Sequence, residues 1–381
     1  MRTSSEPAAS GSAWEQELRR FVQARREIFY LKTDIQVPDE LLKRLAVGRE
    51  PEFPFTWETV AAACRDALGG EPSRIEPLRH QGTFHRLLRA RIRDGEEVIF
   101  RINVLSDLFR DFQLWINPWI SRTLRQRGVP CVEVLAADAT RRVVPFDFEV
   151  VRPAAGVCLR ELDSDEPRIL EELGRLGEVV ARMHQVRTSG FGFLDPSPFV
   201  RGKPDARGAG MLEGWADYVL LNLSRHVRTC VDIGVLAPAK ADRIETLFEQ
   251  LEPMLRDVRP SLLHGDLGSH NVFTDGQEIT GLIDLDDCLS GDPVFDIALW
   301  ATFHPPRRHR AFLDGYKRGA SLPRDFAPRF WLYFLRAALS KTVHRYRFGY
   351  QDQPGRSPAS RRITDGLDGL ETALADKGAS T

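Results

Sequence analysis

Apolar and polar residues alternate in several short runs in the first half of the chain, and a period of two predicts strands with one buried face. Three runs follow one another closely: SRIEPL, FHRLLRARI and EEVIFRINV. Two more lie further along: VEVLAAD and FDFEVVR. Between the two groups we predict one long helix over about residues 107–127, ended by Gly128-Val129-Pro130. These elements predict a small antiparallel sheet with one inserted helix.

After Gly156 the apolar residues recur at helical spacing, in the stretches LEELGRLGEVVARMHQV, WADYVLLNLSRHV and ADRIETLFEQLEPML. Two short strand-like runs, NVFTD and EITGLIDL, are separated by a turn at Asp275-Gly276. Asp292-Pro293 has the cap and the first-turn proline of a helix start. The whole pattern predicts an α+β fold in which a strand-rich lobe precedes a mainly helical lobe.

The same patterns divide the chain into four parts. Residues 1–50 form an N-terminal extension with an amphipathic helix, residues 51–155 the strand-rich lobe, residues 156–355 the helical lobe, and residues 356–381 a loose C-terminal tail. The extension could pack on the first lobe, form a dimer contact or cover a pocket. Packing is the simplest of these three alternatives.

Composition narrows the class of protein. A chain of 381 residues with 42% hydrophobic residues is typical of a globular protein with two lobes. A formal net charge of −1 predicts neither a nucleic-acid partner nor a membrane surface. The five cysteines are widely spaced and never form C-x-x-C, which argues against disulfides or zinc and favours a reducing compartment. Because no secretory signal or membrane-spanning run is apparent, we expect a cytoplasmic protein.

The stretch from His264 to Trp300 contains eight acids and no Lys or Arg. Its first part, HGDLGSHN, places Asp266 and Asn271 on one loop, and Asp284 ends the next predicted strand. Phosphoryl transfer needs a carboxylate that orients the attacking hydroxyl, together with oxygen ligands for Mg²⁺. Aspartate and asparagine also cap ordinary turns. The combined order of the three residues favours a catalytic loop.

HGDLGSHNV followed by GLIDLDDCLSGDPVFDIA resembles the aminoglycoside phosphotransferase family, a group of small-molecule kinases with a protein-kinase-like fold. The resemblance covers about residues 56–350. It implies two lobes, with an N-terminal antiparallel sheet and one long helix followed by a mainly helical C-terminal lobe. It also implies that Asp266 orients the acceptor hydroxyl and accepts its proton, and that Asn271 and Asp284 bind Mg²⁺.

Further polar residues surround this motif. By the resemblance, His264 braces the loop and Asp296 hydrogen-bonds loop amides, while Asp292 caps a helix. Asp286 and Asp287 are extra acids that either lie exposed on a loop or attract a cationic substrate. An exposed loop is the simpler interpretation.

The nucleotide side carries fewer signals. HQGTFH, with Gly82 and Thr83, would form the turn that covers the phosphates, since backbone N–H groups can bind phosphate oxygens. Arg101 stands where the family has a Lys or Arg on the α- and β-phosphates, and an arginine can bind phosphate with two hydrogen bonds. By the same resemblance, the hinge VVRPAAG would bind adenine through backbone groups near Arg152 and Ala154.

Protein kinases pair this basic residue with a glutamate on the inserted helix. Here that helix, SDLFRDFQLWINPWISRTLRQRG, contains no Glu. Its only acids are Asp107 and Asp111, and Asp111 is the candidate partner of Arg101.

The leading hypothesis is an Mg²⁺-dependent phosphotransferase that uses ATP or GTP to phosphorylate a hydroxyl of a small molecule, such as an aminoglycoside-like antibiotic or an amino sugar. The acids of the second lobe favour a cationic acceptor. A protein kinase is less compatible with the sequence, because the few residues between Asp284 and Gly291 leave no room for an activation segment. A degenerate nucleotide-binding module is the other alternative, although all three motif residues are present. The oligomeric state is open.

Overall fold

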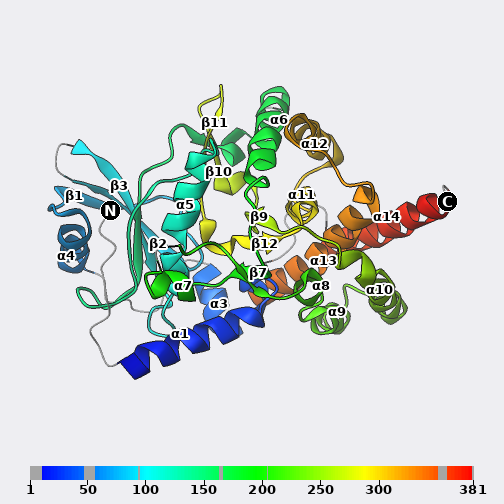
Figure 1. Ribbon diagram of the computed structural model, residues 1–381, viewed down its shortest axis with the longest axis horizontal. Coiled ribbons are helices and arrows are strands. Elements are labelled where there is room, and N and C mark those ends of the chain that lie inside the picture. The colour runs from blue at the N-terminus through cyan, green and yellow to red at the C-terminus, as the bar shows by residue number, and fades with distance from the viewer. Residues whose placement is uncertain are drawn as a thin grey trace.

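The computed structural model describes residues 11–46, 56–92, 95–162, 166–203, 205–350 and 358–379. Figure 1 shows a sheet-containing lobe at one end of the molecule and a helical lobe at the other. The predicted α+β fold with two lobes is confirmed. The predicted division points next to residues 51 and 356 fall outside the described residues.

The N-terminal lobe is built on a five-stranded antiparallel sheet in the order β1-β2-β3-β5-β4. Its strands are β1 (Arg74–Pro77), β2 (His85–Arg91), β3 (Glu97–Asn103), β4 (Val134–Asp138) and β5 (Phe148–Val151), and they confirm the five predicted strands. Leu88, Phe100 and Val150 form the core of this lobe together with apolar residues of α4 (Trp57–Leu68). The period of two therefore arises because one face of the sheet is covered by a helix.

The inserted helix is shorter than predicted. Instead of one helix over residues 107–127, the structure has a 3-10 turn, η2 (Phe112–Trp115), followed by α5 (Asn117–Gln126). The Asp111 side chain accepts a hydrogen bond from Gln113 N and caps the turn, and Pro118 lies in the first turn of α5. Because the Asp111 carboxylate takes up the backbone N–H group of Gln113, the helical segment begins directly after Asp111 and not at residue 107.

The C-terminal lobe is mainly helical. Its helices are α6 (Glu166–Met183), α7 (Ser197–Val200), α8 (Trp215–Val219), α9 (Leu223–Asp232), α10 (Pro238–Leu251), α11 (Pro293–Ala301), α12 (Pro306–Gly319) and α13 (Phe326–Arg347), with 3-10 turns η3 (Leu159–Leu162), η4 (Glu252–Leu255), η5 (Ser269–Asn271) and η6 (Leu285–Asp287). Its strands are β6 (Val157–Cys158), β7 (Phe191–Leu194), β8 (Gly210–Leu212), β9 (Ser261–Leu263), β10 (Val272–Thr274), β11 (Ile279–Leu282) and β12 (Leu289–Gly291). They form two small sheets, β11-β10-β6 and β8-β7-β12-β9. None of the described helices is both long and apolar enough to cross a bilayer.

Two predictions for this lobe are wrong. The stretch WADYVLLNLSRHV is not one helix, because Asn222 adopts a left-handed conformation (φ +57°) and separates α8 from α9. The predicted loose tail is instead the helix α14 (Ala359–Ala379), which packs against α13. Ile363, Leu367 and Leu370 are buried at helical spacing, and this apolar stripe explains why the segment folds onto α13.

The N-terminal extension packs against both lobes. It contains α1 (Gly11–Arg26), α2 (Leu31–Asp34) and α3 (Asp39–Ala46), and α1 runs along one side of the molecule (Figure 1). Leu18 of α1 is buried between Phe112 of the first lobe and Val200 of the second. Packing is thus what α1 does. The segment that follows α1 belongs to the same extension and does more than pack.

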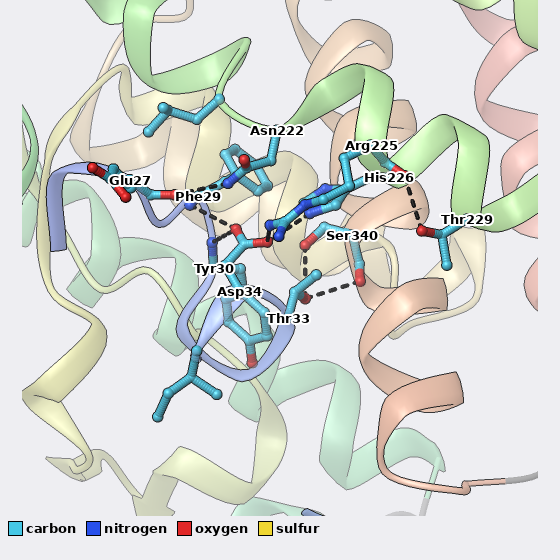
Figure 2. Close-up of polar contacts among 12 residues, drawn as sticks. Glu27, Phe29, Tyr30, Thr33, Asp34, Asn222, Arg225, His226, Thr229 and Ser340 are labelled. Atoms are coloured by element: carbon cyan, nitrogen blue, oxygen red, sulfur yellow. Dashed lines mark hydrogen bonds and ion pairs between the residues drawn. The ribbon is translucent and has the colours of Figure 1, made fainter. Parts of the chain in front are cut away.

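Residues 27–34 are fastened into the C-terminal lobe by the carboxylate of Asp34 (Figure 2). The Asp34 side chain is only 1% exposed and accepts hydrogen bonds from the backbone N–H groups of Phe29 and Tyr30. It also contacts Arg225 and, at 2.7 Å, His226 Nε2 of α9. A buried carboxylate with this many donors fixes the chain that surrounds it.

The protonation state of His226 follows from its two neighbours. The Arg336 guanidinium lies 3.0 Å from His226 Nδ1, and because arginine can only donate, Nδ1 must accept. Nε2 then carries the proton and donates to Asp34. Burial, aided by Arg336, lowers the pKa of His226 to about 4, so the ring is neutral at neutral pH.

This arrangement predicts a loss of stability in acid. The folded-state pKa of His226 lies below its unfolded value of about 6.5, so the unfolded chain binds the extra proton as the pH falls from about 6.5 towards 4. At pH 5 this group alone should remove about 2 kcal/mol from the free energy of unfolding. His226→Gln keeps a donor and an acceptor but cannot titrate. Urea titrations at pH 7.5 and pH 5 should show a pH effect smaller by about 2 kcal/mol in the variant, and equal pH effects in the two proteins would contradict this assignment.

Candidate active site

The loop that follows β9 is held in place by Asp296 of α11. The two oxygens of the Asp296 carboxylate accept hydrogen bonds from His264 N (2.7 Å) and Gly265 N (3.0 Å), which confirms the predicted contact with loop amides. His184 lies 3.2 Å from the same carboxylate. Gly265 has φ +78°, and a Cβ there would overlap the carbonyl oxygen of Asp287. The loop is therefore rigid, and its glycine is required by both conformation and space.

Asp266 is buried and its carboxylate has three partners. Lys32 Nζ lies 2.8 Å from Oδ2, while Lys341 Nζ (2.8 Å) and the Tyr30 hydroxyl (3.1 Å) donate to Oδ1. Burial opposes the ionisation of Asp266, but the ammonium groups of Lys32 and Lys341 outweigh it and hold the pKa of this carboxyl well below its usual range. The carboxylate is therefore charged at neutral pH.

Asn271 connects Asp266 to Asp284. The Asn271 side chain donates from Nδ2 to the backbone oxygen of Asp266 at 2.9 Å, and its own backbone oxygen accepts from Ile283 N at 3.0 Å. His264 Nε2 lies 3.0 Å from the oxygen of Ile283 and braces the same point, as predicted. These bonds place Asp284 next to the loop.

Asp284 has a left-handed conformation (φ +62°), and its half-buried carboxylate contacts Arg101. The pair of oxygen ligands offered by Asn271 and Asp284 suits Mg²⁺, which commonly takes only one or two ligands from the protein. Among the described residues no group of three His, Cys, Asp or Glu could hold a metal ion. Two oxygen ligands from the protein fit Mg²⁺ that is held jointly with phosphates.

Arg101 on β3 faces Asp284 across the junction of the lobes. It donates to Asp284 Oδ1 at 2.8 Å, to Asp286 Oδ2 at 2.6 Å and to Glu149 Oε2 at 2.5 Å. The prediction that Asp111 is its partner is wrong, because the Asp111 carboxylate accepts from Gln113 N instead and its backbone N–H donates to Asp147. Glu149 is the partner on the neighbouring strand, directly opposite Arg101 in the pairing of β3 with β5. Pairing the two predicted strands in the sequence could have identified it.

Asp286 and Asp287 do not lie on an exposed loop, so that interpretation is wrong. Both are buried. Asp286 binds Arg101 and also accepts from Asn117 Nδ2 at 2.8 Å. Against its burial, Arg101 lowers the pKa of Asp286. Burial raises the pKa of Asp287 to about 7, and its Oδ1 has no hydrogen-bond partner among the described residues.

The remaining residues expected to bind nucleotide lie at the junction between the lobes. Gly82 and Thr83 form the turn just before β2. Ala154 follows β5, and a Cβ at Gly281 would lie 3.0 Å from the Ala154 side chain. Arg152 N already donates to the oxygen of Glu133 at 2.9 Å, so this N–H is not available to adenine. Hydrogen bonds from the hinge to adenine would therefore have to come from the carbonyl oxygen of Arg152 or from the residues that follow it.

A cavity of about 920 Å³ opens beside Asp266 in the C-terminal lobe. Its lining includes Tyr30, Lys32, His270, Phe303, Trp331 and Lys341. Sequence patterns did not identify Tyr30, Lys32 or Lys341 as site residues. Tyr30 and Lys32 lie in the extension, about 235 residues before the loop they contact, and Lys341 lies on a long helix without a motif.

The comparisons with known proteins agree with this geometry. The model of the phosphotransferase enzyme family matches residues 78–334. The chain belongs to this family. The resemblance to aminoglycoside phosphotransferases that the motif indicated is thereby confirmed.

Two curated proteins are similar to this phosphotransferase family member. Hygromycin-B 4-O-kinase of Escherichia coli is 28% identical over 208 residues, which are 54% of this chain and 55% of that protein. Homoserine kinase of Methylobacillus flagellatus is 28% identical over 231 residues, which are 55% of this chain and 64% of that protein. The chain thus spans less than two thirds of the length of either relative.

Solved structures of the family share the fold. One is a thermostable mutant of aminoglycoside phosphotransferase APH(4)-Ia in a ternary complex with AMP-PNP and hygromycin B, with a TM-score of 0.59, 20% identity, and coverage of 82% of this chain and 98% of that chain. Another is the gentamicin–APH(2″)-IIa complex, with a TM-score of 0.52, 13% identity, and coverage of 84% and 97%. At these identities the likeness establishes the fold.

Proposed function

We propose that this protein transfers the γ-phosphoryl group of ATP or GTP to a hydroxyl of a small molecule. The observation that carries the proposal is the chain of contacts through Asn271, which ties the loop of Asp266 to Asp284. Arg101 reaches Asp284 from the other lobe. An acceptor site beside Asp266 and a nucleotide site beside Arg101 would then meet at one point, which is the arrangement that phosphoryl transfer requires.

In this proposal Asp266 orients the acceptor hydroxyl and receives its proton as the phosphoryl group is transferred. A carboxylate offers about four lone-pair positions. Three are occupied by Tyr30, Lys32 and Lys341, which leaves one position on Oδ2 for the hydroxyl. Because the carboxylate is held ionised, it can accept this hydrogen bond at neutral pH.

Asn271 and Asp284 would hold Mg²⁺, which when bound neutralises charge on the phosphate oxygens. Arg101 would bind the α- and β-phosphates, since Glu149 and Asp286 keep its guanidinium fixed. Gly82 and Thr83 would cover the phosphates, and the hinge near Arg152 and Ala154 would receive the base. ATP is favoured over GTP by the AMP-PNP in the related ternary complex.

The relatives suggest which acceptors to test. They include a hygromycin-B 4-O-kinase and a homoserine kinase, so antibiotics, amino sugars and amino alcohols such as homoserine form a reasonable first set. A protein kinase is disfavoured because η6, Cys288 and β12 fill the segment between Asp284 and Asp292 and leave no room for an activation loop.

The test is turnover of Mg·ATP and Mg·GTP against aminoglycosides, hygromycin B, amino sugars, homoserine and simple sugar alcohols, with the Asp266→Ala protein as blank. Acceptor-dependent release of ADP or GDP that disappears in the blank supports the proposal. Nucleotide binding without turnover on any acceptor would favour the degenerate binding module instead.

A further inference from the structure

Lys32 lines the cavity beside Asp266, which we call the acceptor cavity, and it lies on a segment whose backbone is fixed by hydrogen bonds. Next to it, Thr33 Oγ1 donates to the oxygen of Ser340 at 3.0 Å, a contact visible in Figure 2. The Arg347 guanidinium donates to the backbone oxygens of Thr33 (2.7 Å) and Ile35 (3.0 Å). Together with the Asp34 contacts, these bonds fasten the segment to α13. The register of Thr33 with Ser340 places Lys32 beside Lys341.

The two lysines place an excess of positive charge around one carboxylate. The side chains of Lys32, Lys341 and Asp266 are 16%, 7% and 2% exposed. One ammonium would be enough to pair with Asp266. The second makes this cluster of three groups net positive in a place with little water. Such an excess charge is costly, and burial accordingly lowers the pKa of Lys341.

The neighbouring groups do not remove this excess. Burial, with the nearby Lys341 and Lys32, keeps the pKa of His344 well below its usual range, so this ring is neutral and adds no charge. Asp287 interacts electrostatically with Lys32, but burial raises the pKa of Asp287 to about 7, so it carries only part of a negative charge at neutral pH.

The acids that suggested a cationic acceptor are already engaged. Asp286 and Asp284 both bind Arg101, and Asp286 also binds Asn117. They therefore offer little to a positively charged substrate. The cavity is also lined by Arg345, Arg362, Asp365 and Asp368. The charged groups that contact Asp266, however, are the ammonium groups of Lys32 and Lys341. An ammonium has three protons, so Lys32 and Lys341 can each bind a further oxygen besides Asp266.

We propose that Lys32 and Lys341 form an anion-binding subsite of the acceptor cavity, and that the acceptor is an alcohol that carries a carboxylate or a phosphate close to its reacting hydroxyl. This inference rests on the proposed function and specifies its substrate class. It reverses the expectation of a cationic acceptor. The aromatic rings of Tyr30 and Phe303, at 3.7 and 5.0 Å from Lys341 Nζ, hold that ammonium in place.

The first test measures anion binding directly. Protein saturated with Mg²⁺ and AMP-PNP is titrated calorimetrically with inorganic sulfate. We expect one saturable site in the wild type, with affinity lowered at least about tenfold in Lys32→Met and Lys341→Met and restored in part in Lys32→Arg. Lys317→Met is the matched control, because Lys317 lies exposed on α12, and it should bind like the wild type. Absence of saturable binding, or wild-type affinity in Lys32→Met, would overturn the proposal.

The same titration distinguishes the two sources of an anion. If the lysines serve the γ-phosphate of the nucleotide and not the acceptor, AMP-PNP will abolish sulfate binding whereas ADP will leave it intact. That result would also overturn the proposal. Thermal unfolding of each variant establishes that it is folded before its affinity is compared.

The second test compares alcohols with carboxylates of similar shape, namely glycerol with glycerate and glucose with glucuronate, and uses glucosamine as the cationic member. We expect turnover with an acid, with KM raised at least about tenfold in Lys32→Met. Turnover with glucosamine alone would overturn the anionic acceptor and leave the proposed function standing. If none of these acceptors is phosphorylated, the result counts against the proposed function. The sulfate titration then tests the anion-binding subsite independently of turnover.

Discussion

Asp266→Asn is expected to lower kcat by about 10²–10⁴-fold, the usual contribution of a positioned general base. Asparagine has nearly the same shape and keeps one oxygen acceptor, so the loop held by Asp296 and Asn271 should not move. What is lost is the negative charge and the ability to receive a proton. The affinity for Mg·ADP should change by less than about threefold, because Asp266 faces the acceptor cavity.

A suitable control is Asp314→Asn, which removes an exposed acid on α12 that lies 3.8 Å from Lys317 Nζ. Single-turnover kinetics at saturating acceptor would separate chemistry from binding. The variant also leaves Lys32 and Lys341 without their charge partner, so its thermal stability should be lower than that of the control. Near wild-type kcat in Asp266→Asn would disprove the role proposed for this carboxylate.

Asp284→Asn is expected to remove most of the Mg²⁺ dependence of nucleotide binding. Asparagine tolerates the left-handed conformation of this residue, so the backbone should be retained. Arg101 keeps Glu149 and Asp286 as partners and stays in place. The loss therefore reports on the metal ligand and not on a displaced arginine.

The measurement is the ADP dissociation constant with and without Mg²⁺. In the wild type Mg²⁺ should tighten ADP binding at least about tenfold, or about 1.4 kcal/mol, and in Asp284→Asn this gain should fall to about twofold or less. Asp275→Asn, at the tip of the β10–β11 hairpin, serves as a control on the same structural unit. An unchanged Mg²⁺ effect in Asp284→Asn would place the metal ligand elsewhere.

Sequence patterns predicted the structure correctly where burial of one face of an element determines the pattern. The period of two in FHRLLRARI and EEVIFRINV reflects one buried face, and these strands are β2 and β3. The predicted helix over residues 107–127 was wrong because the Asp111 side chain binds a backbone N–H group there. The predicted loose tail was wrong because an apolar stripe packs α14 against α13. In both cases the deciding contact is a specific side chain and not an average over a window.

The chain by itself determined the motif residues, because Asp266, Asn271 and Asp284 lie within one short stretch and the hairpin between them brings them together. Their roles stay predictions. Only the tertiary structure decided what surrounds Asp266. Tyr30, Lys32 and Lys341 come from segments far apart in sequence, and their approach depends on the burial of Asp34 and the packing of α13. Contacts of this kind leave no periodic trace in the sequence, since each requires one side chain at one position.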